Sequence, residues 1–129
     1  MVHALVVDDS RAMRMVLRRS LERLGFVVYE ASHGREALAV LEGMSAVPDI
    51  ALVDWNMPEM DGLEFIKVIH TDRRWSTMTV MMVTSEGEPA RLVEALTAGA
   101  DEYLTKPFQQ EAFINKLNLH GLAANEVNA

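Results

Sequence analysis

Five short apolar runs, separated by segments with helical spacing, constrain the fold of this chain more than any other feature. The runs are rich in β-branched residues and lie at residues 2–7, 26–29, 50–53, 80–83 and 103–104. The middle runs are continuous rather than alternating, which is typical of strands buried on both faces of a parallel sheet. Between the runs and after the last, apolar residues recur every three or four positions, which predicts five helices.

Residues at the borders of these segments support the division. Gly25 and Gly99 fall where helices are expected to end, and such positions favour glycine because the backbone turns left-handed there. Asp61 and Glu64 have the spacing of a capping box, and Pro89 fits the first turn of the fourth helix. Five strand–helix repeats predict an α/β fold, a doubly wound parallel sheet with right-handed crossovers.

Composition limits the class of protein. The chain has 129 residues, half of them apolar, so we expect one domain over residues 1–122 and a short polar tail over 123–129. It has no cysteine, which excludes a disulfide framework and a thiolate metal site. The net charge of −7 disfavours binding to nucleic acid or to an anionic membrane surface. The start lacks the basic region of a signal peptide, and we expect a cytoplasmic protein.

Polar residues with chemically useful side chains follow four of the five expected strands. In an open parallel sheet, ligands bind beyond the carboxyl ends of the strands, so these residues are expected to meet at one edge. The second strand, which ends near residues 30–32, offers nothing distinctive. The other four end in Asp8 and Asp9, in Asp54, in Thr84 and Ser85, and in Lys106.

Three carboxylates at one site repel one another unless a cation compensates them. Lys106 supplies a single positive charge, so a hard divalent cation is expected as well, and Mg²⁺ is the usual choice where phosphate also binds. A carboxylate can attack phosphorus to form an acyl phosphate. Phosphoryl transfer otherwise needs positioning and charge neutralisation, which a metal, a lysine and a hydroxyl provide.

Five segments, in order along residues 5–119, resemble the receiver domain of response regulators in two-component signalling. They are 6–10 (VVDDS), 54–62 (DWNMPEMDG), 83–85 (VTS), 99–103 (GADEY) and 105–108 (TKPF). The resemblance implies a flavodoxin-like fold with five parallel strands in the order 2-1-3-4-5 and five helices. It also implies a phosphoacceptor switch rather than an enzyme, with self-catalysed phosphotransfer and autodephosphorylation at most.

The resemblance also assigns roles to individual residues. Asp54 is expected to accept the phosphoryl group, and Thr84 and Lys106 to contact it. Mg²⁺ is expected to be bound by Asp9, by Asp54 and by the backbone carbonyl of Asn56, with Asp8 acting through water.

Four further positions are expected to control the switch. Ser85 leaves room for the phosphoryl group, and Asn56 and Glu86 tune autodephosphorylation. Tyr103 occupies the aromatic switch position, although a half-buried strand aromatic is the simpler interpretation of that residue alone. The Lys106–Pro107 peptide bond is cis in the family, but the sequence leaves cis and trans open.

The resemblance implies protein partners. A sensor histidine kinase or a His-phosphotransfer domain is the expected donor, and the expected output surface spans residues 88–119. The segment DWNMP, Glu86 and Tyr103 are closest to stand-alone chemotaxis regulators, so the downstream target is expected to be a protein such as a flagellar motor switch. We expect a monomer.

Several alternatives stay open at this point. A phosphorelay shuttle, or a receiver cut from a larger regulator, fits the same motifs. A small phosphohydrolase with an Asp nucleophile is disfavoured because Asn56 stands where such enzymes place a second acid. A flavin-binding protein is disfavoured because Asp8 and Asp9 replace its phosphate loop.

Two other sequence features have competing interpretations. The arginines of the first helix indicate either a solvated face or a docking surface for the phospho-His donor; they are Arg11, Arg14, Arg18, Arg19 and Arg23. The nine methionines are interpreted as core residues rather than as a binding surface. The four histidines lack metal-ligand spacing, so no zinc site is predicted.

Overall fold

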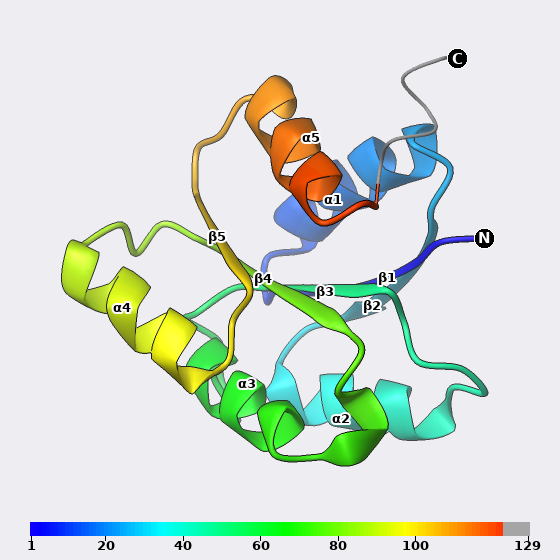
Figure 1. Ribbon diagram of the computed structural model, residues 1–129, viewed down its shortest axis with the longest axis vertical. Coiled ribbons are helices and arrows are strands. Elements are labelled where there is room, and N and C mark those ends of the chain that lie inside the picture. The colour runs from blue at the N-terminus through cyan, green and yellow to red at the C-terminus, as the bar shows by residue number, and fades with distance from the viewer. Residues whose placement is uncertain (123–129) are drawn as a thin grey trace.

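The computed structural model describes residues 1–122, and the predicted polar tail at 123–129 lies outside the described residues. One parallel sheet of five strands runs through the centre, in the order β2-β1-β3-β4-β5, with helices on both faces (Figure 1). The strands are β1 (His3–Val7), β2 (Val27–Ala31), β3 (Ile50–Val53), β4 (Thr79–Thr84) and β5 (Glu102–Thr105). The helices are α1 (Arg11–Arg23), α2 (Gly34–Gly43), α3 (Gly62–His70), α4 (Pro89–Ala98) and α5 (Gln110–Leu119). The predicted fold class and strand order are confirmed.

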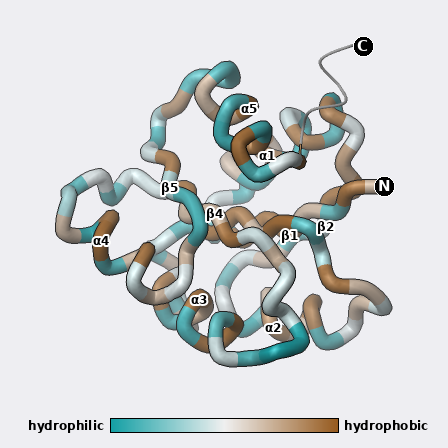
Figure 2. Tube along the Cα trace, viewed as in Figure 1, coloured by the Kyte–Doolittle hydropathy of each residue, from teal (hydrophilic) through white to brown (hydrophobic). Residues whose placement is uncertain are grey.

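The central strands are buried on both faces, as their continuous apolar character predicts. β3 is buried along its whole length, and in β1 the last four residues are fully buried. Figure 2 shows the hydrophobic strands between helices whose outward turns are hydrophilic. Burial of apolar surface stabilises a fold by about 25 cal/mol per Å², so these buried strands contribute to its stability.

Each face of the sheet has its own apolar layer. α1 and α5 cover one face, where Leu17 and Phe113 are buried against β1 and β4. α2, α3 and α4 cover the other face, with Leu41, Ile66 and Ala95 as examples of their buried residues. The carboxyl ends of all five strands therefore lie at one edge, between the two helical layers.

The helix borders follow the sequence signals. Gly25 and Gly99 have φ angles of +90° and +126°, a left-handed conformation that glycine adopts without cost. The side chains of Asp61 and Glu64 form the predicted capping box at the start of α3. Pro89 occupies the first turn of α4.

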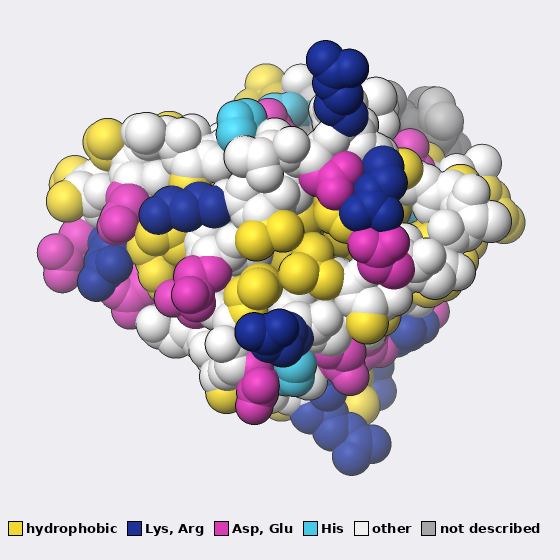
Figure 3. Space-filling view, turned by 90° about the horizontal axis from the view of Figure 1, so that it is seen from below, with side chains coloured by type: hydrophobic (Ala, Val, Ile, Leu, Met, Phe, Trp, Pro, Cys, Tyr) yellow, Lys and Arg dark blue, Asp and Glu magenta, His cyan; other side chains and the backbone are white. Residues whose placement is uncertain are grey.

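The structure adds a short 3₁₀ helix, η1 (Arg73–Trp75), which the sequence analysis did not predict. Of the methionines, Met78, Met81 and Met82 are buried, as a core role requires, whereas Met15 is 43% exposed on α1. Viewed from the side of α2 and α3, the surface carries charged side chains of both signs next to one another, around exposed apolar atoms (Figure 3). Among residues 1–122, no helix combines the length and apolar character needed to cross a membrane.

Candidate functional site

The three aspartates predicted at the strand ends meet at the carboxyl edge of the sheet. Asp8 and Asp9 follow β1, and Asp54 follows the adjacent strand β3. Each offers a carboxylate oxygen, and these oxygens all lie within 4.8 Å of one another. The parallel pairing of β1 with β3 is what brings residues so distant in the sequence together.

Lys106, which follows β5, reaches into this group of acids. Its Nζ atom lies 2.8 Å from Asp8 Oδ2 and 3.4 Å from Asp54 Oδ2. The Lys106 side chain is 15% exposed and that of Asp8 only 2%, so the pair is largely shielded from water. We call Asp8, Asp9, Asp54 and Lys106 the aspartate cluster. The Lys106–Pro107 peptide bond is cis.

The electrostatic state of Asp54 reflects this crowding. Burial raises the pKa of Asp54, the positive charge of Lys106 opposes that rise, and the negative charge of Asp8 adds to it. Hydrogen bonds from the Thr84 hydroxyl and from the Trp55 N–H also lower the pKa, but the net shift is upward. Trp55 N donates to Asp54 Oδ1 over 2.7 Å. The ionised form of Asp54 is therefore destabilised until further positive charge arrives.

Thr84 and Ser85 complete the edge of the site from β4. Thr84 is fully buried at the end of the strand, and its Oγ1 accepts a hydrogen bond from Glu86 N at 3.3 Å. Ser85, the next residue, is exposed. The buried hydroxyl thus lies against the acids, while the small side chain faces solvent.

A chain of polar contacts links the loop after β3 to the start of α4. Asn56 Nδ2 donates to Glu86 Oε2 at 3.0 Å, and Arg91 lies 3.8 Å from the other oxygen of Glu86. The Arg91 guanidinium also stacks over the ring of Trp55, with its carbon 5.0 Å from the ring centroid. Sequence reasoning missed Arg91, because nothing in a helical arginine indicates which distant ring it covers.

Tyr103 lies on β5 with its ring directed into the molecule, and it is 8% exposed. Its hydroxyl donates to the backbone carbonyl of Glu86. Burial and the negative charge of Glu86 raise the pKa of Tyr103. Tyr103, the expected switch residue, therefore contacts Glu86, the residue that Asn56 and Arg91 also contact.

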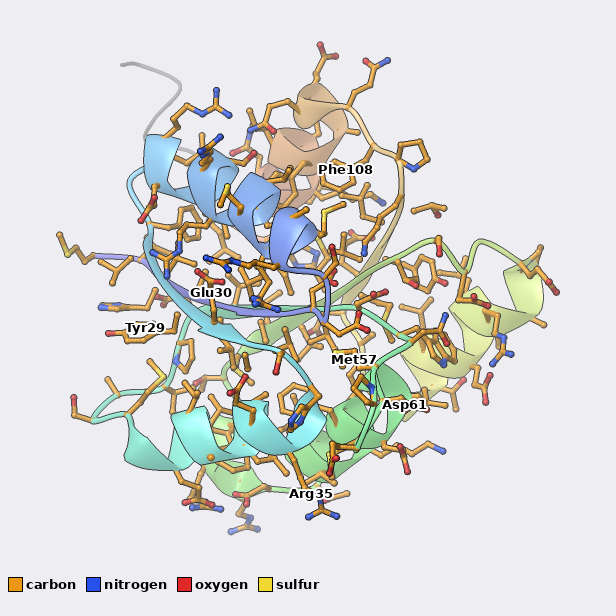
Figure 4. The ribbon with its side chains drawn as sticks, turned by 180° about the vertical axis from the view of Figure 1, so that it is seen from behind. Tyr29, Glu30, Arg35, Met57, Asp61 and Phe108 are labelled. Atoms are coloured by element: carbon orange, nitrogen blue, oxygen red, sulfur yellow. The ribbon has the colours of Figure 1, made fainter. Side chains whose placement is uncertain are left out.

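We call residues 54–61, between β3 and α3, the acceptor loop; Figure 4 shows its residues Met57 and Asp61. Gly62 closes this loop, with its N–H donating to Trp55 O at 2.8 Å. A Cβ atom at Gly62 would lie 2.0 Å from the Asp54 carbonyl oxygen, so no other residue fits without moving the loop. Gly62 was part of the motif, but its close approach to Asp54 is visible only in the structure.

The donor atoms of the site suit a hard divalent cation. Asp8, Asp9 and Asp54 supply carboxylate oxygens, which Mg²⁺ prefers, and Asp9 is exposed and so accessible from solvent. Asn56, whose backbone carbonyl is the remaining predicted ligand, lies in the acceptor loop two residues beyond Asp54. Lys106 offsets one of the three negative charges, so the remaining negative charge favours binding of a cation.

The sequence analysis found nothing distinctive at the end of the second strand, but the structure shows a charged network there. Glu30, near its end, accepts hydrogen bonds from Arg14 Nε at 3.0 Å and from Arg18 Nε at 2.5 Å. Two of the five arginines of α1 are therefore bound to the sheet rather than solvated. The other three are exposed on the surface of α1; they are Arg11, Arg19 and Arg23.

Comparison with known proteins identifies the family to which this site belongs. Residues 4–118 match the response regulator receiver domain. The chain belongs to the response regulator receiver family. The predicted resemblance is thereby confirmed.

Several relatives are chemotaxis proteins. Chemotaxis protein CheY1 of Helicobacter pylori is 41% identical over 116 residues, which cover 89% of this chain and 93% of the relative. The chemotaxis protein CheY homolog of Campylobacter jejuni is 43% identical over 114 residues, which cover 88% of this chain and 87% of the relative. The structure of CheY4 of Vibrio cholerae matches with a TM-score of 0.84 at 34% identity, covering 92% of this chain and 98% of that one.

Proposed function

We propose that this chain is a stand-alone response regulator that accepts a phosphoryl group on Asp54 from a phospho-His donor. The observation that supports this most is the convergence of three aspartates, Thr84 and Lys106 at one sheet edge in a receiver fold. A sensor histidine kinase or a His-phosphotransfer domain would be the protein that donates the group. In the transfer, a carboxylate oxygen of Asp54 forms a bond to phosphorus as the P–N bond of the donor breaks.

Asp9, Asp54 and the backbone carbonyl of Asn56 would bind Mg²⁺ directly, and Asp8 would act through water. When bound, the ion neutralises the charge that develops on the phosphoryl oxygens. Lys106, which already lies 3.4 Å from Asp54, would pair with the phosphoryl group. The Thr84 hydroxyl would donate a hydrogen bond to a phosphoryl oxygen, and the small side chain of Ser85 leaves space for the group.

Once Asp54 is phosphorylated, Thr84 would be drawn toward the phosphoryl group, and the signal would pass to the surface through Tyr103. Such a signal is a shift between two existing conformations, biased by the bond between Thr84 and the phosphoryl group. Asn56 and Glu86, which are hydrogen-bonded to each other, would set the rate of autodephosphorylation. The chain acts as a switch, with no catalytic turnover of an external substrate.

The output surface consists of α4, β5 and α5. Relatives named as chemotaxis proteins favour a role in chemotaxis, with a protein of the flagellar motor switch as target. Nucleic acid and membrane surfaces are poor partners for a chain of net charge −7. We place the chain in the cytoplasm as a monomer.

The test is phosphorylation of the purified chain with a small phosphodonor and Mg²⁺, followed by intact mass. We expect one labile phosphoryl adduct in the wild type. Steady hydrolysis of an unactivated phosphate monoester would instead indicate a phosphohydrolase. Transfer of the group onward to a second His domain would indicate a phosphorelay shuttle, and phosphorylation-dependent binding to a motor-switch protein supports the chemotaxis function.

A further inference from the structure

Glu30 lies on β2, on the side of the sheet that faces α1 (Figure 4). Its two carboxylate oxygens are divided between two arginines of α1: Oε1 accepts from Arg14 and Oε2 from Arg18. Burial alone would raise the pKa of Glu30, but the hydrogen bonds from Arg18 and Arg14 lower it below its ordinary value. We call Arg14, Arg18 and Glu30 the Glu30 cluster.

The two arginines differ in what else they bind. Arg14 Nη1 donates to the backbone carbonyl of Asp8 at 2.6 Å. Arg18 instead donates to the carbonyl of Val28 at 3.1 Å and pairs with Glu22 at 3.0 Å. Arg14 therefore joins the Glu30 cluster to the aspartate cluster, and Arg18 does not.

The Asp8 carbonyl is at the point where the chain leaves β1 and turns into α1. Asp8 N donates to the carbonyl of Ala31 at 3.1 Å, and Asp8 Oδ1 accepts from Ser10 N at 2.9 Å. Asp9 lies inside this turn and is itself exposed. The direction of the Asp9 side chain thus depends on how firmly the turn is held. Two charged, largely buried side chains contact Asp8: Lys106 bonds to its carboxylate, and Arg14, 17% exposed, bonds to its backbone carbonyl.

We propose that Arg14, held in place by Glu30, is a positioning residue for the divalent metal site. Its guanidinium bridges the Glu30 carboxylate and the Asp8 carbonyl, which fixes the turn that carries Asp9. This inference rests on the proposed function, because it concerns the metal that phosphorylation requires. It adds that metal affinity is set in part from β2, the one strand that contributes no residue to the site.

Charge and geometry make opposite contributions here. Loss of the Arg14 charge would by itself favour a nearby cation, whereas loss of its hydrogen bonds would loosen the turn and disfavour one. Lysine separates the two effects, because it keeps the charge but its single ammonium cannot reproduce the planar fork that spans two acceptors. Arg18→Lys is the matched control, since it makes the same chemical change at the same carboxylate without touching Asp8.

The experiment measures Mg²⁺ affinity from the fluorescence of Trp55, which is hydrogen-bonded to Asp54. All variants carry Trp75→Phe, so that Trp55 alone emits. We expect Arg14→Lys to raise the Kd for Mg²⁺ about tenfold, the lower range for groups that orient metal ligands, and Arg18→Lys to change it less than about twofold. Thermal unfolding in EDTA checks that the two variants lose comparable stability.

Equal changes in Kd for the two lysine variants would overturn the inference, because a general loss of stability would then explain both. If Arg14→Lys does not fold, Glu30→Gln tests the same contact, since the neutral amide holds Arg14 less firmly, and an unchanged Kd would again overturn it. A wild-type chain that shows neither a Mg²⁺ response nor a phosphoryl adduct would instead contradict the proposed function. Failure of the inference alone leaves the wild-type titration and adduct intact.

Discussion

Two charged clusters lie on either side of the Asp8 backbone, and they are balanced in opposite ways. In the aspartate cluster, three carboxylates lie together and the single ammonium of Lys106 contacts two of them, Asp8 and Asp54. In the Glu30 cluster, two guanidiniums share one carboxylate. The first retains excess negative charge and a raised pKa at Asp54, while the second has a lowered pKa at Glu30.

The difference separates a site that needs a ligand from a network that is complete in itself. The acids of the aspartate cluster reach their most stable charged state only when a cation is added, so the cluster is suited to bind metal and phosphoryl groups. The Glu30 cluster already satisfies its carboxylate, so its role is to hold structure. Arg14 lies at the boundary between them.

The largest effect is expected from a substitution that removes the phosphoryl acceptor. Asp54→Asn keeps the shape of the side chain but removes the nucleophilic carboxylate, so the phosphoryl adduct should vanish. Intact mass after treatment with a small phosphodonor and Mg²⁺ measures this. The control is Glu30→Gln at saturating Mg²⁺, which offsets any loss of metal affinity; it removes a carboxylate from the other cluster and should retain the adduct. A full adduct in Asp54→Asn would refute the assignment of the acceptor.

The next largest effect is expected from a substitution that removes the lysine ammonium of the aspartate cluster. Lys106→Met leaves Asp8 buried without its ammonium, and breaking such a pair costs about 3 kcal/mol of unfolding free energy. Urea unfolding in EDTA should show this loss. Saturating Mg²⁺ should restore more stability in the variant than it adds to the wild type, because an added cation replaces the missing charge. No recovery with Mg²⁺ would mean that the metal does not bind beside Asp8.

Acid titration should show opposite signs for the two clusters. The lowered pKa of Glu30 contributes stability above its unfolded pKa, and this is lost as pH falls through the folded value. The raised pKa of Asp54 contributes stability below its unfolded pKa, and this is lost as pH rises through the folded value.

Urea unfolding in EDTA between about pH 2.5 and 7 tests both signs. Glu30→Gln should lose most relative to wild type at neutral pH and little at the acid end. Asp54→Asn should gain relative to wild type as pH rises. Two variants with the same pH trend would contradict the comparison of the clusters.

The smallest expected effect concerns the acceptor loop. Glu59 has a φ angle of 67°, a left-handed conformation that asparagine adopts more readily. Glu59→Asn should therefore stabilise the fold by about 0.5 kcal/mol, seen as a slight rise in the urea midpoint. Glu64→Asn, in the capping box of α3, is the contrasting change and should destabilise the fold. A stabilised Glu64→Asn would show that loss of acidic charge, rather than relief at Glu59, explains the gain.

Much of the fold was predictable because local signals agreed with one another. Continuous apolar runs located the strands, Asp61 and Glu64 marked the start of α3, and Gly25 and Gly99 marked helix ends. The strand order came from the family resemblance rather than from spacing. Asp8, Asp54 and Lys106 were predicted to meet because the ends of parallel strands share one edge.

The Glu30 cluster was not predictable in the same way. A glutamate at the end of a strand and arginines on a helix are common on solvated surfaces, and their pairing depends on how α1 crosses the sheet. The stacking of Arg91 on Trp55 depends likewise on the path of the loop after β4. Such contacts arise from tertiary packing, which leaves no periodic signal along the chain.

Trp55 contacts both the phosphoryl acceptor and helix α4, so its fluorescence can report on each of them. The backbone N–H of Trp55 donates to the acceptor carboxylate, and its ring, 4% exposed, lies under a guanidinium that belongs to α4. Emission from this indole therefore responds both to ions at Asp54 and to displacement of α4. Arg91→Met would remove the second response and keep the first. The difference between the fluorescence traces of the wild type and this variant would therefore report when α4 moves relative to phosphorylation.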